Sequence, residues 1–391
     1  MRKVSIFGST GSIGANTVDL LSRAPRSSYD VVALTGGRNI ALLAQQATQL
    51  GADIAVTAFD DCLHDLRDAL AGTGIETASG TAALCEVATR PCDWTMSAIV
   101  GAAGLFPGFA ALNQGGSLAL ANKESLVCAG PLLLREAEHN NATILPVDSE
   151  HSAVFQALTG EKISAVERII ITASGGPFRD WPVEALANVT LAEAVAHPNW
   201  SMGQRISIDS ASMFNKALEL IETREFFGIQ PERIEVLVHP ESLVHALVGF
   251  QDGALMAHIG PPDMRHAIGF ALNWPDRSAL PVARLDLAAI GQLNFASPDI
   301  ARFPALRLAR EVMDTGGRAG AVFNGAKEVA LDLFIAGQIG FLDMVRIVET
   351  ALERCDRESS LSKPLESLDC VTEADHMARK AALDAAPAAS G

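Results

Sequence analysis

Paired cysteines, targeting segments and long apolar runs are all absent from this sequence. Its six cysteines include no C-x-x-C pair, so neither a disulfide framework nor a zinc site is expected, and we interpret them as buried thiols in a reducing compartment. No signal or transit segment precedes the first apolar run, 3–7. No apolar stretch of transmembrane length is free of polar breaks. These absences predict a soluble cytoplasmic protein.

Positive charge is scarce as well. The 391 residues carry 30 lysines and arginines against 46 acidic residues, a formal net charge of −16. This balance argues against nucleic acid or an anionic membrane as a partner over most of the surface. A site for a phosphorylated ligand must therefore be a local basic pocket. With 49 % hydrophobic residues, the chain is long enough for two or three globular domains.

What is present begins with a glycine-rich turn. An apolar run at 3–7 leads into Gly8-Ser-Thr-Gly11-Ser-Ile-Gly14, and a helix pattern follows. Between a strand and a helix, glycines at this spacing let the backbone approach a pyrophosphate at the helix N-terminus. An ordinary turn of an α/β domain would look similar. Strand and helix patterns then alternate as far as residue 147, which predicts a doubly wound parallel sheet.

The end of the second predicted strand, 29–34, bears on the choice of dinucleotide. NAD-preferring proteins carry an acidic residue near this point, which binds the ribose 2′-hydroxyl. Here the strand is followed by Thr35-Gly-Gly-Arg38-Asn39, without a carboxylate. Because a guanidinium can hold a 2′-phosphate in a bidentate manner, Arg38 favours NADP. A solvated arginine at the start of a helix is the alternative interpretation.

Asn122, Lys123 and Glu124 follow another strand of this predicted sheet, at 117–121. Ligands of such sheets bind at the carboxyl ends of the strands, so these three side chains are well placed for binding. Asn122 would also make an ordinary helix N-cap, with first-turn charges after it. Both interpretations can hold together.

Two carboxylates, Asp148 and Glu150, follow the last strand of this region, at 143–147. If 145–150 is extended, both point to the same side, because side chains alternate along a strand. A divalent ion would relieve their repulsion, and oxygen ligands suit Mg²⁺ or Mn²⁺. A loop with a helix N-cap at 148 or 149 is the alternative.

The organisation changes after this point. An apolar strand at 166–172 is followed by Ser174-Gly-Gly, whose hydroxyl and N–H groups could form an anion nest, or only a turn before a proline. His197-Pro-Asn-Trp-Ser-Met-Gly203 is poor in helix formers, and we interpret it as a mobile loop able to close over a ligand. Trp200 within this loop could instead fill a core.

The next stretch combines a predicted strand at 205–209 with a predicted helix that begins at Ser210. On such a helix, Asn215, Lys216 and Glu219 share one face. Serine, asparagine and lysine near a helix start suit a phosphate, and the glutamate one turn further could reach the metal suggested above. The alternative is a surface lysine–glutamate pair behind a serine cap.

The rest of the chain completes the expected domains. Strand-like runs at 234–239, 242–250 and 254–259 suggest an antiparallel extension of a second sheet, and such strands often form a homodimer interface. Amphipathic helix patterns fill much of 305–382. We expect an α/β fold with an N-terminal doubly wound, Rossmann-like dinucleotide-binding domain (1–148), an α+β catalytic and dimerisation domain (149–275), a linker (276–303), a C-terminal helical domain (304–384) and a disordered tail (385–391).

Six motifs occur in one order along the chain. They are Gly8-x-Thr-Gly-Ser-Ile-Gly14, Asn122-Lys-Glu-Ser125, Val147-Asp-Ser-Glu-His151, Ser174-Gly-Gly-Pro-Phe178, His197-Pro-Asn-Trp-Ser-Met-Gly203 and Asp209-Ser-Ala-Ser-Met-Phe-Asn-Lys-Ala-Leu-Glu219. Together they resemble the 1-deoxy-D-xylulose 5-phosphate reductoisomerase family, over about residues 3–355. The resemblance implies an oxidoreductase and isomerase of isoprenoid biosynthesis. It would use NADPH and Mn²⁺ or Mg²⁺ to rearrange and reduce a small phosphorylated sugar to 2-C-methyl-D-erythritol 4-phosphate.

The resemblance also implies roles for single residues. The metal would be held by Asp148, Glu150 and Glu219, and with Lys123 and His197 these form the catalytic set. The substrate would contact Lys123, Ser149, Glu150, Ser174, His197, Trp200, Ser210, Asn215, Lys216 and Glu219, with its phosphate at Ser174, Ser210, Asn215 and Lys216. NADPH would contact Thr10, Gly11, Ser12, Ile13, Gly36, Gly37, Arg38, Asn39, Asn122, Glu124 and Gly203.

Two departures from the family's pattern leave the implied function unchanged, because arginine and lysine can both pair with a 2′-phosphate and the second departure affects only local geometry. The family commonly has lysine where Arg38 stands, and Arg265-His-Ala-Ile268 lacks a usual proline.

Two other functions stay open at this point. One is an NADP-dependent dehydrogenase of another small phosphorylated or acidic substrate, which would need no metal. The other is a catalytically silent NADP-binding regulator on the same fold.

Overall fold

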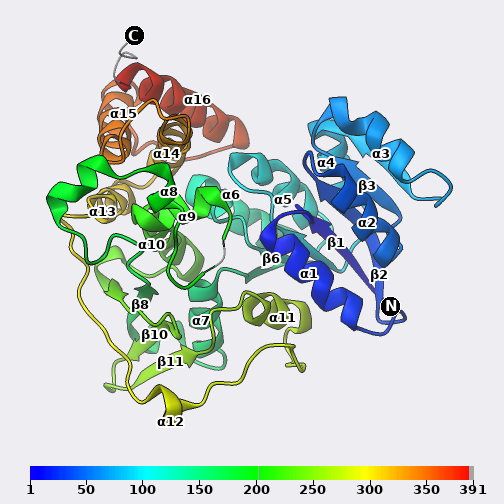
Figure 1. Cartoon of the computed structure of the whole chain (residues 1–391), viewed down its shortest axis with the longest axis horizontal. Helices are drawn as coiled ribbons and strands as arrows, with labels where there is room; N and C mark the ends of the chain where they lie inside the picture. The colour runs from blue at the N-terminus through cyan, green and yellow to red at the C-terminus, as the bar shows by residue number, and fades with distance from the viewer. Residues whose placement is uncertain (201, 387–391) are drawn as a thin grey trace. The chain divides into compact units, whose positions relative to one another are not determined.

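Seven parallel strands form the larger sheet of the computed structural model, which describes residues 1–200 and 202–386 (Figure 1). Their order is β4-β3-β2-β1-β5-β6-β7, and all neighbouring strands run parallel. This confirms the predicted doubly wound sheet. The strands are β1 (Arg2–Phe7), β2 (Tyr29–Gly36), β3 (Ile54–Thr57), β4 (Glu76–Ser79), β5 (Trp94–Ser97), β6 (Ser117–Leu120) and β7 (Thr143–Pro146).

The strand order creates one point where the chain changes direction across the sheet. It starts at β1, runs outward to β4 and returns beside β1 with β5. Open α/β sheets bind ligands at such a switch point, at the carboxyl ends of the strands. Helices on both faces explain why residues 4–7 of β1 are all buried, on either side of the strand. The helices are α1 (Ser12–Arg23), α2 (Ile40–Leu50), α3 (Leu63–Ala69), α4 (Gly80–Ala88), α5 (Leu105–Leu112) and α6 (Lys123–His139).

A segment from much later in the chain completes this part of the fold. Helix α11 (Arg265–Asn273) packs against α1, β6 and β7. The fully buried Trp94 in β5 donates its indole N–H to the carbonyl oxygen of Ala271 in α11, at 3.0 Å. Internal contacts thus define a first compact unit made of three stretches: Met1–Ser125, Leu133–Ser152 and Asp263–Ala283.

The second unit contains a four-stranded sheet of order β11-β10-β8-β9. Strand β10 is antiparallel to both β8 and β11, as predicted, but β9 is parallel to β8. The prediction of a wholly antiparallel extension is therefore wrong. The chain between β8 and β9 contains several helices, and a crossover of this length returns a strand in the same direction. The strands are β8 (Val166–Ala173), β9 (Ile234–Val238), β10 (Val244–Phe250) and β11 (Leu255–Ile259).

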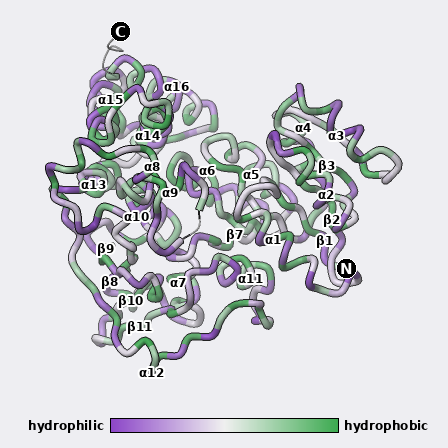
Figure 2. The backbone as a smooth tube through the Cα atoms, in the orientation of Figure 1, coloured by the Kyte–Doolittle hydropathy of each residue, from purple (hydrophilic) through white to green (hydrophobic). Residues whose placement is uncertain are grey.

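The helices of the second unit confirm the predicted helical C-terminal region. Helix α14 packs against both α15 and α16, and most of its side chains are buried. Hydrophilic and hydrophobic residues follow one another along α16, as expected of a helix with one buried face (Figure 2). The helices are α8 (Leu191–Ala194), α9 (Gln204–Ala211), α10 (Phe214–Phe227), α12 (Leu287–Ile290), α13 (Ala305–Thr315), α14 (Ala319–Ile335), α15 (Asp343–Ser359) and α16 (Leu368–Ala385), while α7 (Ser149–Ala157) is shared between the units.

The strand predicted at 205–209 is wrong, because these residues belong to helix α9. Five residues that alternate between polar and apolar are too few to distinguish a strand from a helix with a polar face. The helix predicted from Ser210 is in fact two helices. Met213 adopts a left-handed conformation, with φ of 62°, and separates α9 from α10. Ser210 therefore lies in the last turn of α9 and not at a helix start.

The stretch around Asp148 also differs from an extended strand. Strand β7 ends at Pro146 and α7 begins at Ser149, so Glu150 is helical. The prediction that 145–150 is extended, with both carboxylates on one side of a strand, is therefore wrong. The alternative of a loop that leads into a helix start near 148 or 149 agrees with the structure.

Three general predictions concern the whole chain. All six cysteines are free thiols as predicted, but only Cys62, Cys128 and Cys355 are buried. No helix among the described residues is long and apolar enough to cross a membrane. Of the predicted tail, 387–391 lie outside the described residues, and the predicted linker contains α12 as its single named helix. The domain boundaries at 148, 275 and 303 stay predictions.

Candidate functional site

The glycine turn after β1 brings the backbone very close to itself. Gly8 has φ of 86°, and a Cβ atom on Gly14 would lie 2.2 Å from the carbonyl oxygen of Gly8. Gly11 is the N-cap of α1, with no side-chain cap, and the first turn of α1 contains no acidic residue. Backbone N–H groups at a helix N-terminus of this kind suit a pyrophosphate. The predicted cofactor residues Thr10, Gly11, Ser12 and Ile13 all lie in this turn and the start of α1.

The turn after β2 lies beside this glycine turn. A Cβ atom on Gly36 would be 3.2 Å from the side chain of Thr10. Arg38 donates to Asp61 at 2.7 Å, and its guanidinium stacks 4.0 Å above the ring of Phe59. The Asp61 carboxylate raises the pKa of Arg38, and the arginine lowers the pKa of Asp61. Both side chains are exposed, so the guanidinium is accessible to a ligand.

Asn122 caps a helix, as predicted. Its Oδ1 accepts the N–H of Ser125 at 2.9 Å, which caps α6. Its Nδ2 donates to the carbonyl oxygens of Ile99 and Gly101, at 2.6 and 2.9 Å, and to Glu124 at 3.0 Å. The buried side chain therefore joins the loop after β5 to the start of α6.

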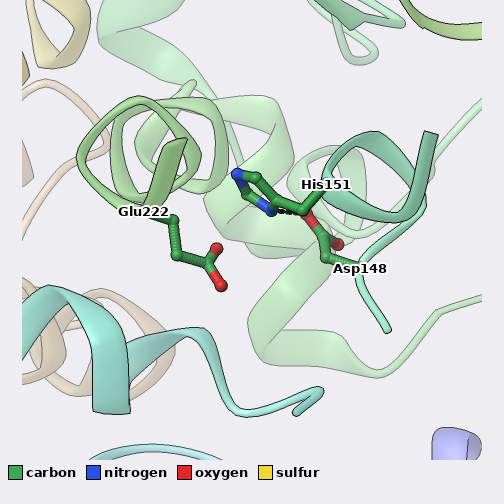
Figure 3. A group of neighbouring side chains, drawn as sticks. All are labelled: Asp148, His151 and Glu222. Carbon is green, nitrogen blue, oxygen red and sulfur yellow. Dashed lines mark ion pairs between the residues drawn. The ribbon is translucent and has the colours of Figure 1, made fainter. Parts of the chain in front are cut away.

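Lys123, Asp148 and His151 form a charged cluster at the carboxyl ends of β6 and β7. Lys123 Nζ lies 3.4 Å from Asp148 Oδ1, and His151 Nδ1 lies 3.2 Å from Asp148 Oδ2 (Figure 3). A carboxylate oxygen of Asp148 lies within 4.8 Å of one of Glu150, which also accepts a hydrogen bond from Ser149. Hard oxygen donors at this separation fit a divalent metal ion.

In the second unit, the turn after β8 is built around Ser174. Its hydroxyl accepts the N–H of Gly176 at 3.1 Å and lies 2.9 Å from His197 Nε2. Gly176 has φ of 68°, and a Cβ atom there would be 3.0 Å from the carbonyl oxygen of Ser210. The glycine thus lets the Ser174 turn pack directly on α9. Two predicted phosphate ligands from distant parts of the sequence are brought together in this way.

The hydrogen bonds of His197 define its tautomer. The backbone N–H groups of Asn199 and Trp200 donate to Nδ1, at 3.2 and 3.0 Å. Nδ1 is therefore an acceptor, and the proton of the neutral ring is on Nε2, which donates to Ser174. Burial lowers the pKa of His197, which agrees with a neutral ring. The imidazole joins the loop at 197–203 to the Ser174 turn.

This arrangement predicts a pH-dependent stability. The pKa of His197 is lowered from its usual value of 6.5, so the unfolded chain binds this proton at higher pH than the folded chain. The free energy of unfolding should therefore decrease as the pH falls from 6.5 through the folded pKa. Thermal unfolding of wild type and His197→Gln between pH 7.5 and 5 checks this, because the variant should lose less stability. Parallel losses in both proteins would contradict the assignment.

A further cluster lies at the start of α10. Asn215 and Lys216 both donate to the carboxylate of Glu219, one turn further along the helix. Lys216 and Glu219 are buried, at 3 % and 1 % exposed. The alternative of a solvated surface pair is therefore wrong. A half-buried amide beside a buried ammonium and carboxylate on one helix face suits binding of both an anion and a cation.

The loop at 197–203 rests on the turn between β9 and β10. Asn199 donates to the carbonyl oxygen of Pro240 and, at 3.0 Å, to Ser242 Oγ. The Trp200 ring lies 6.2 Å from the His245 ring, in an edge-on arrangement. Gly203 caps α9, and a Cβ atom there would meet nothing within 4 Å. Trp200 is half-buried here, so it does not fill a core.

The predicted site residues fall into one group in each unit. Pattern reasoning did not single out Asp61, Phe59 or His151. The turn that contains Phe59 and Asp61 follows β3, the neighbour of β2, so the rule of carboxyl strand ends could have found it. The first unit holds Thr10, Gly11, Ser12, Ile13, Gly36, Gly37, Arg38, Asn39, Asn122, Lys123, Glu124, Asp148, Ser149 and Glu150, and the second holds Ser174, His197, Trp200, Gly203, Ser210, Asn215, Lys216 and Glu219.

Comparisons with known proteins cover almost the whole chain. Three family models match it: 1-deoxy-D-xylulose 5-phosphate reductoisomerase at 4–130, the C-terminal domain of that enzyme at 144–227, and a DXP reductoisomerase C-terminal domain at 259–381. A protein from Ruegeria pomeroyi named 1-deoxy-D-xylulose 5-phosphate reductoisomerase is 69 % identical over 97 % of this chain and 96 % of its own. One so named from Paracoccus denitrificans is 60 % identical, over 98 % of each chain.

Solved structures agree with the sequence comparisons. The Zymomonas mobilis reductoisomerase in complex with NADPH has a TM-score of 0.91 and 46 % identity, over 98 % of both chains. A DOX-P reductoisomerase in complex with NADPH, fosmidomycin and magnesium has a TM-score of 0.93 and 38 % identity, again over 98 % of both. The described fold is thus similar to both along its full length.

Proposed function

The chain belongs to the 1-deoxy-D-xylulose 5-phosphate reductoisomerase family, and we propose that it performs this family's reaction with the residues described above. It converts 1-deoxy-D-xylulose 5-phosphate into 2-C-methyl-D-erythritol 4-phosphate for isoprenoid biosynthesis, with NADPH and a divalent metal. The observation that carries this function is the 69 % identity to a named reductoisomerase over 97 % of the chain. A related structure contains both NADPH and magnesium.

Asp148, Glu150 and Glu219 are the proposed metal ligands. Their support is chemical: three carboxylates suit Mg²⁺ or Mn²⁺, and those of Asp148 and Glu150 lie within 4.8 Å of each other. When bound, the ion supplies Lewis acidity to the oxygens of the substrate. Lys123, whose ammonium group lies 3.4 Å from Asp148, pairs with that carboxylate and faces the reacting carbons together with Ser149.

The second unit supplies the proposed phosphate site. Ser174, Ser210, Asn215 and Lys216 hold the substrate phosphate, and the neutral His197, whose Nε2–H donates to Ser174, also contacts the substrate. The support is the buried ammonium group of Lys216 and the close packing of the Ser174 turn on Ser210. Trp200 covers the bound substrate as part of the loop at 197–203 and excludes water.

NADPH occupies the carboxyl edge of the parallel sheet in this proposal. The uncapped N-terminus of α1 receives the pyrophosphate, and Arg38 receives the 2′-phosphate. Gly203, the N-cap of α9 in the second unit, is proposed as a further contact of the cofactor. The full proposed set is Thr10, Gly11, Ser12, Ile13, Gly36, Gly37, Arg38, Asn39, Asn122, Glu124 and Gly203.

Replacing Arg38 tests the cofactor assignment. Arg38→Met removes the guanidinium but keeps an unbranched side chain above Phe59. We expect the Kd of NADPH to rise about tenfold or more, while the Kd of NADH stays unchanged, because NADH has no 2′-phosphate. Fluorescence titration with both nucleotides measures the ratio. A change of similar size for NADH would mean that Arg38 supports the fold and not the 2′-phosphate.

Removal of the metal discriminates the proposed reaction from a simple dehydrogenase. NADPH oxidation is followed with 1-deoxy-D-xylulose 5-phosphate, first after chelation and then after addition of Mn²⁺ or Mg²⁺. Turnover should be lost on chelation and recovered with either ion, because the metal binds the reacting oxygens. A rate that does not depend on metal would support the NADP-dependent dehydrogenase. No turnover even with metal would contradict the assigned reaction.

The homodimer is proposed from the edge of the smaller sheet. β11 is an outer strand, and its Leu255, Met256 and Ile259 are 41–50 % exposed. An exposed apolar edge strand pairs readily with a second copy. Sedimentation equilibrium should therefore give a dimer mass, and a monomer at micromolar concentration would refute the proposal.

A cytoplasmic location, without nucleic-acid or membrane partners, agrees with the net charge of −16.

A further inference from the structure

Helix α14, far from the proposed ligands in sequence, contacts the segment that contains them. Lys327 Nζ in α14 lies 3.1 Å from Asp209 Oδ2 in α9, and these side chains are only 3 % and 8 % exposed. The Phe323 ring, one turn earlier in α14, lies 5.8 Å from the ring of Phe214 in α10. One helix of the C-terminal region thus holds both α9 and α10.

These contacts surround the backbone break at Met213. Asp209 immediately precedes Ser210, and Asn215 and Lys216 follow the break within three residues. Three of the four proposed phosphate ligands therefore depend on how α9 and α10 are placed on either side of a single left-handed residue. An anchor on each helix would fix that geometry.

The stability of the fold does not by itself require the two charges of the Lys327–Asp209 pair. Desolvation of a buried ion pair offsets most of its attraction, and well-packed apolar residues of similar volume are often as stable or more so. The pair has a second effect on the phosphate site. Without Lys327, the carboxylate of Asp209 would stand uncompensated one residue from Ser210 and repel a phosphate.

We propose that Lys327 and Asp209 are positioning residues, which fix Ser210 and the start of α10 for the phosphate of the substrate. The inference rests on the proposed phosphate site. The pair lies in the second unit, whereas every proposed NADPH contact except Gly203 lies in the first. Its loss should therefore affect the KM of the sugar phosphate and leave the KM of NADPH unchanged.

The test uses the full-length enzyme with metal and NADPH present. The double variant Asp209→Leu/Lys327→Met replaces both charges with apolar groups and should unfold at or near the wild-type temperature. Its KM for 1-deoxy-D-xylulose 5-phosphate should rise about tenfold, with kcat and the KM of NADPH within about twofold of wild type. The inhibition constant of inorganic phosphate, measured as a competitive inhibitor of the sugar phosphate, should rise by a similar factor. Lys327→Met alone should raise the KM further, and Lys327→Arg should restore it.

The neighbouring pair between the same two helices provides a matched control. Arg205 in α9 contacts Asp332 in α14, and both side chains are exposed. Asp332→Asn should leave the KM unchanged, because a surface pair neither fixes a helix strongly nor faces the ligand. A wild-type KM in the double variant would overturn the inference, as would an equal rise in the KM of NADPH.

Lys216→Met separates this inference from the proposed function beneath it. If Lys216→Met raises the KM of the sugar phosphate but the double variant does not, only the positioning role is wrong. If Lys216→Met leaves that KM unchanged, the phosphate site itself is misplaced and the inference fails with it.

Discussion

Glu219→Gln is expected to reduce kcat by about 10²–10³-fold while the affinity for NADPH stays close to wild type. Glu219 is 1 % exposed, and its carboxylate accepts hydrogen bonds from Asn215 and Lys216. The amide keeps the size of the side chain but removes the negative charge that a divalent ion requires. Steady-state kinetics measures the change in kcat, and an NADPH titration measures the affinity for the cofactor. A titration with Mn²⁺ then shows whether metal binding is weakened.

Glu225→Gln is the matched control on the same helix. Glu225 is a largely buried carboxylate of α10 whose pKa is raised by that burial. Its amide variant should leave the affinity for Mn²⁺ unchanged, because Glu225 belongs to no proposed ligand set. An equal loss of affinity for Mn²⁺ and for NADPH in Glu219→Gln would show that the residue serves the fold and not the metal.

Gly14→Ala is expected to cause the largest loss of stability among single changes at the nucleotide edge. The added Cβ would lie 2.2 Å from the carbonyl oxygen of Gly8 and 2.4 Å from Cα of Ser9. Both atoms are backbone, so the turn must open. We expect a loss of roughly 1–3 kcal/mol in the free energy of unfolding. NADPH should bind at least about tenfold more weakly. Thermal unfolding and NADPH titration measure the two effects.

Gly11→Ala provides the comparison for this change. Gly11 has φ of −77°, which any residue adopts, and its added Cβ would be 3.4 Å from the oxygen of Gly8. The free energy of unfolding should therefore change by less than about 0.5 kcal/mol. If both alanine variants lose the same stability, close approach of the backbone at Gly14 is not the reason for its glycine.

The parallel sheet was predictable because its strands carry a strong local signal. Runs such as 3–7 and 117–121 are apolar, short and separated by helix patterns, and few other folds accommodate that alternation. The cap at Asn122 was predictable for the same reason, since an N-cap involves residues three apart. The direction of β9 was not, because the path of a long crossover depends on contacts between distant segments.

The candidate site shows the same division between local and distant contacts. The shared face of Lys216 and Glu219 follows from helix geometry, and the structure contains it. In contrast, α9 resembled a strand because 205–209 alternate between polar and apolar residues, and the partner of its buried Asp209 is Lys327, 118 residues later in the chain. No window of sequence contains both members of such a pair. The contact of Arg38 with Asp61 was also missed, although both residues follow neighbouring strands of the sheet.

The three-part composition of the first unit has a consequence for synthesis on the ribosome. Residues 1–125 contain six of the seven parallel strands, yet the unit also requires 263–283. Until Ala271 leaves the ribosome, the indole N–H of the buried Trp94 lacks its acceptor. The sheet is therefore expected to reach its final stability only after most of the second unit has been translated, so a chain truncated near residue 150 would be a poor substitute for the nucleotide-binding part.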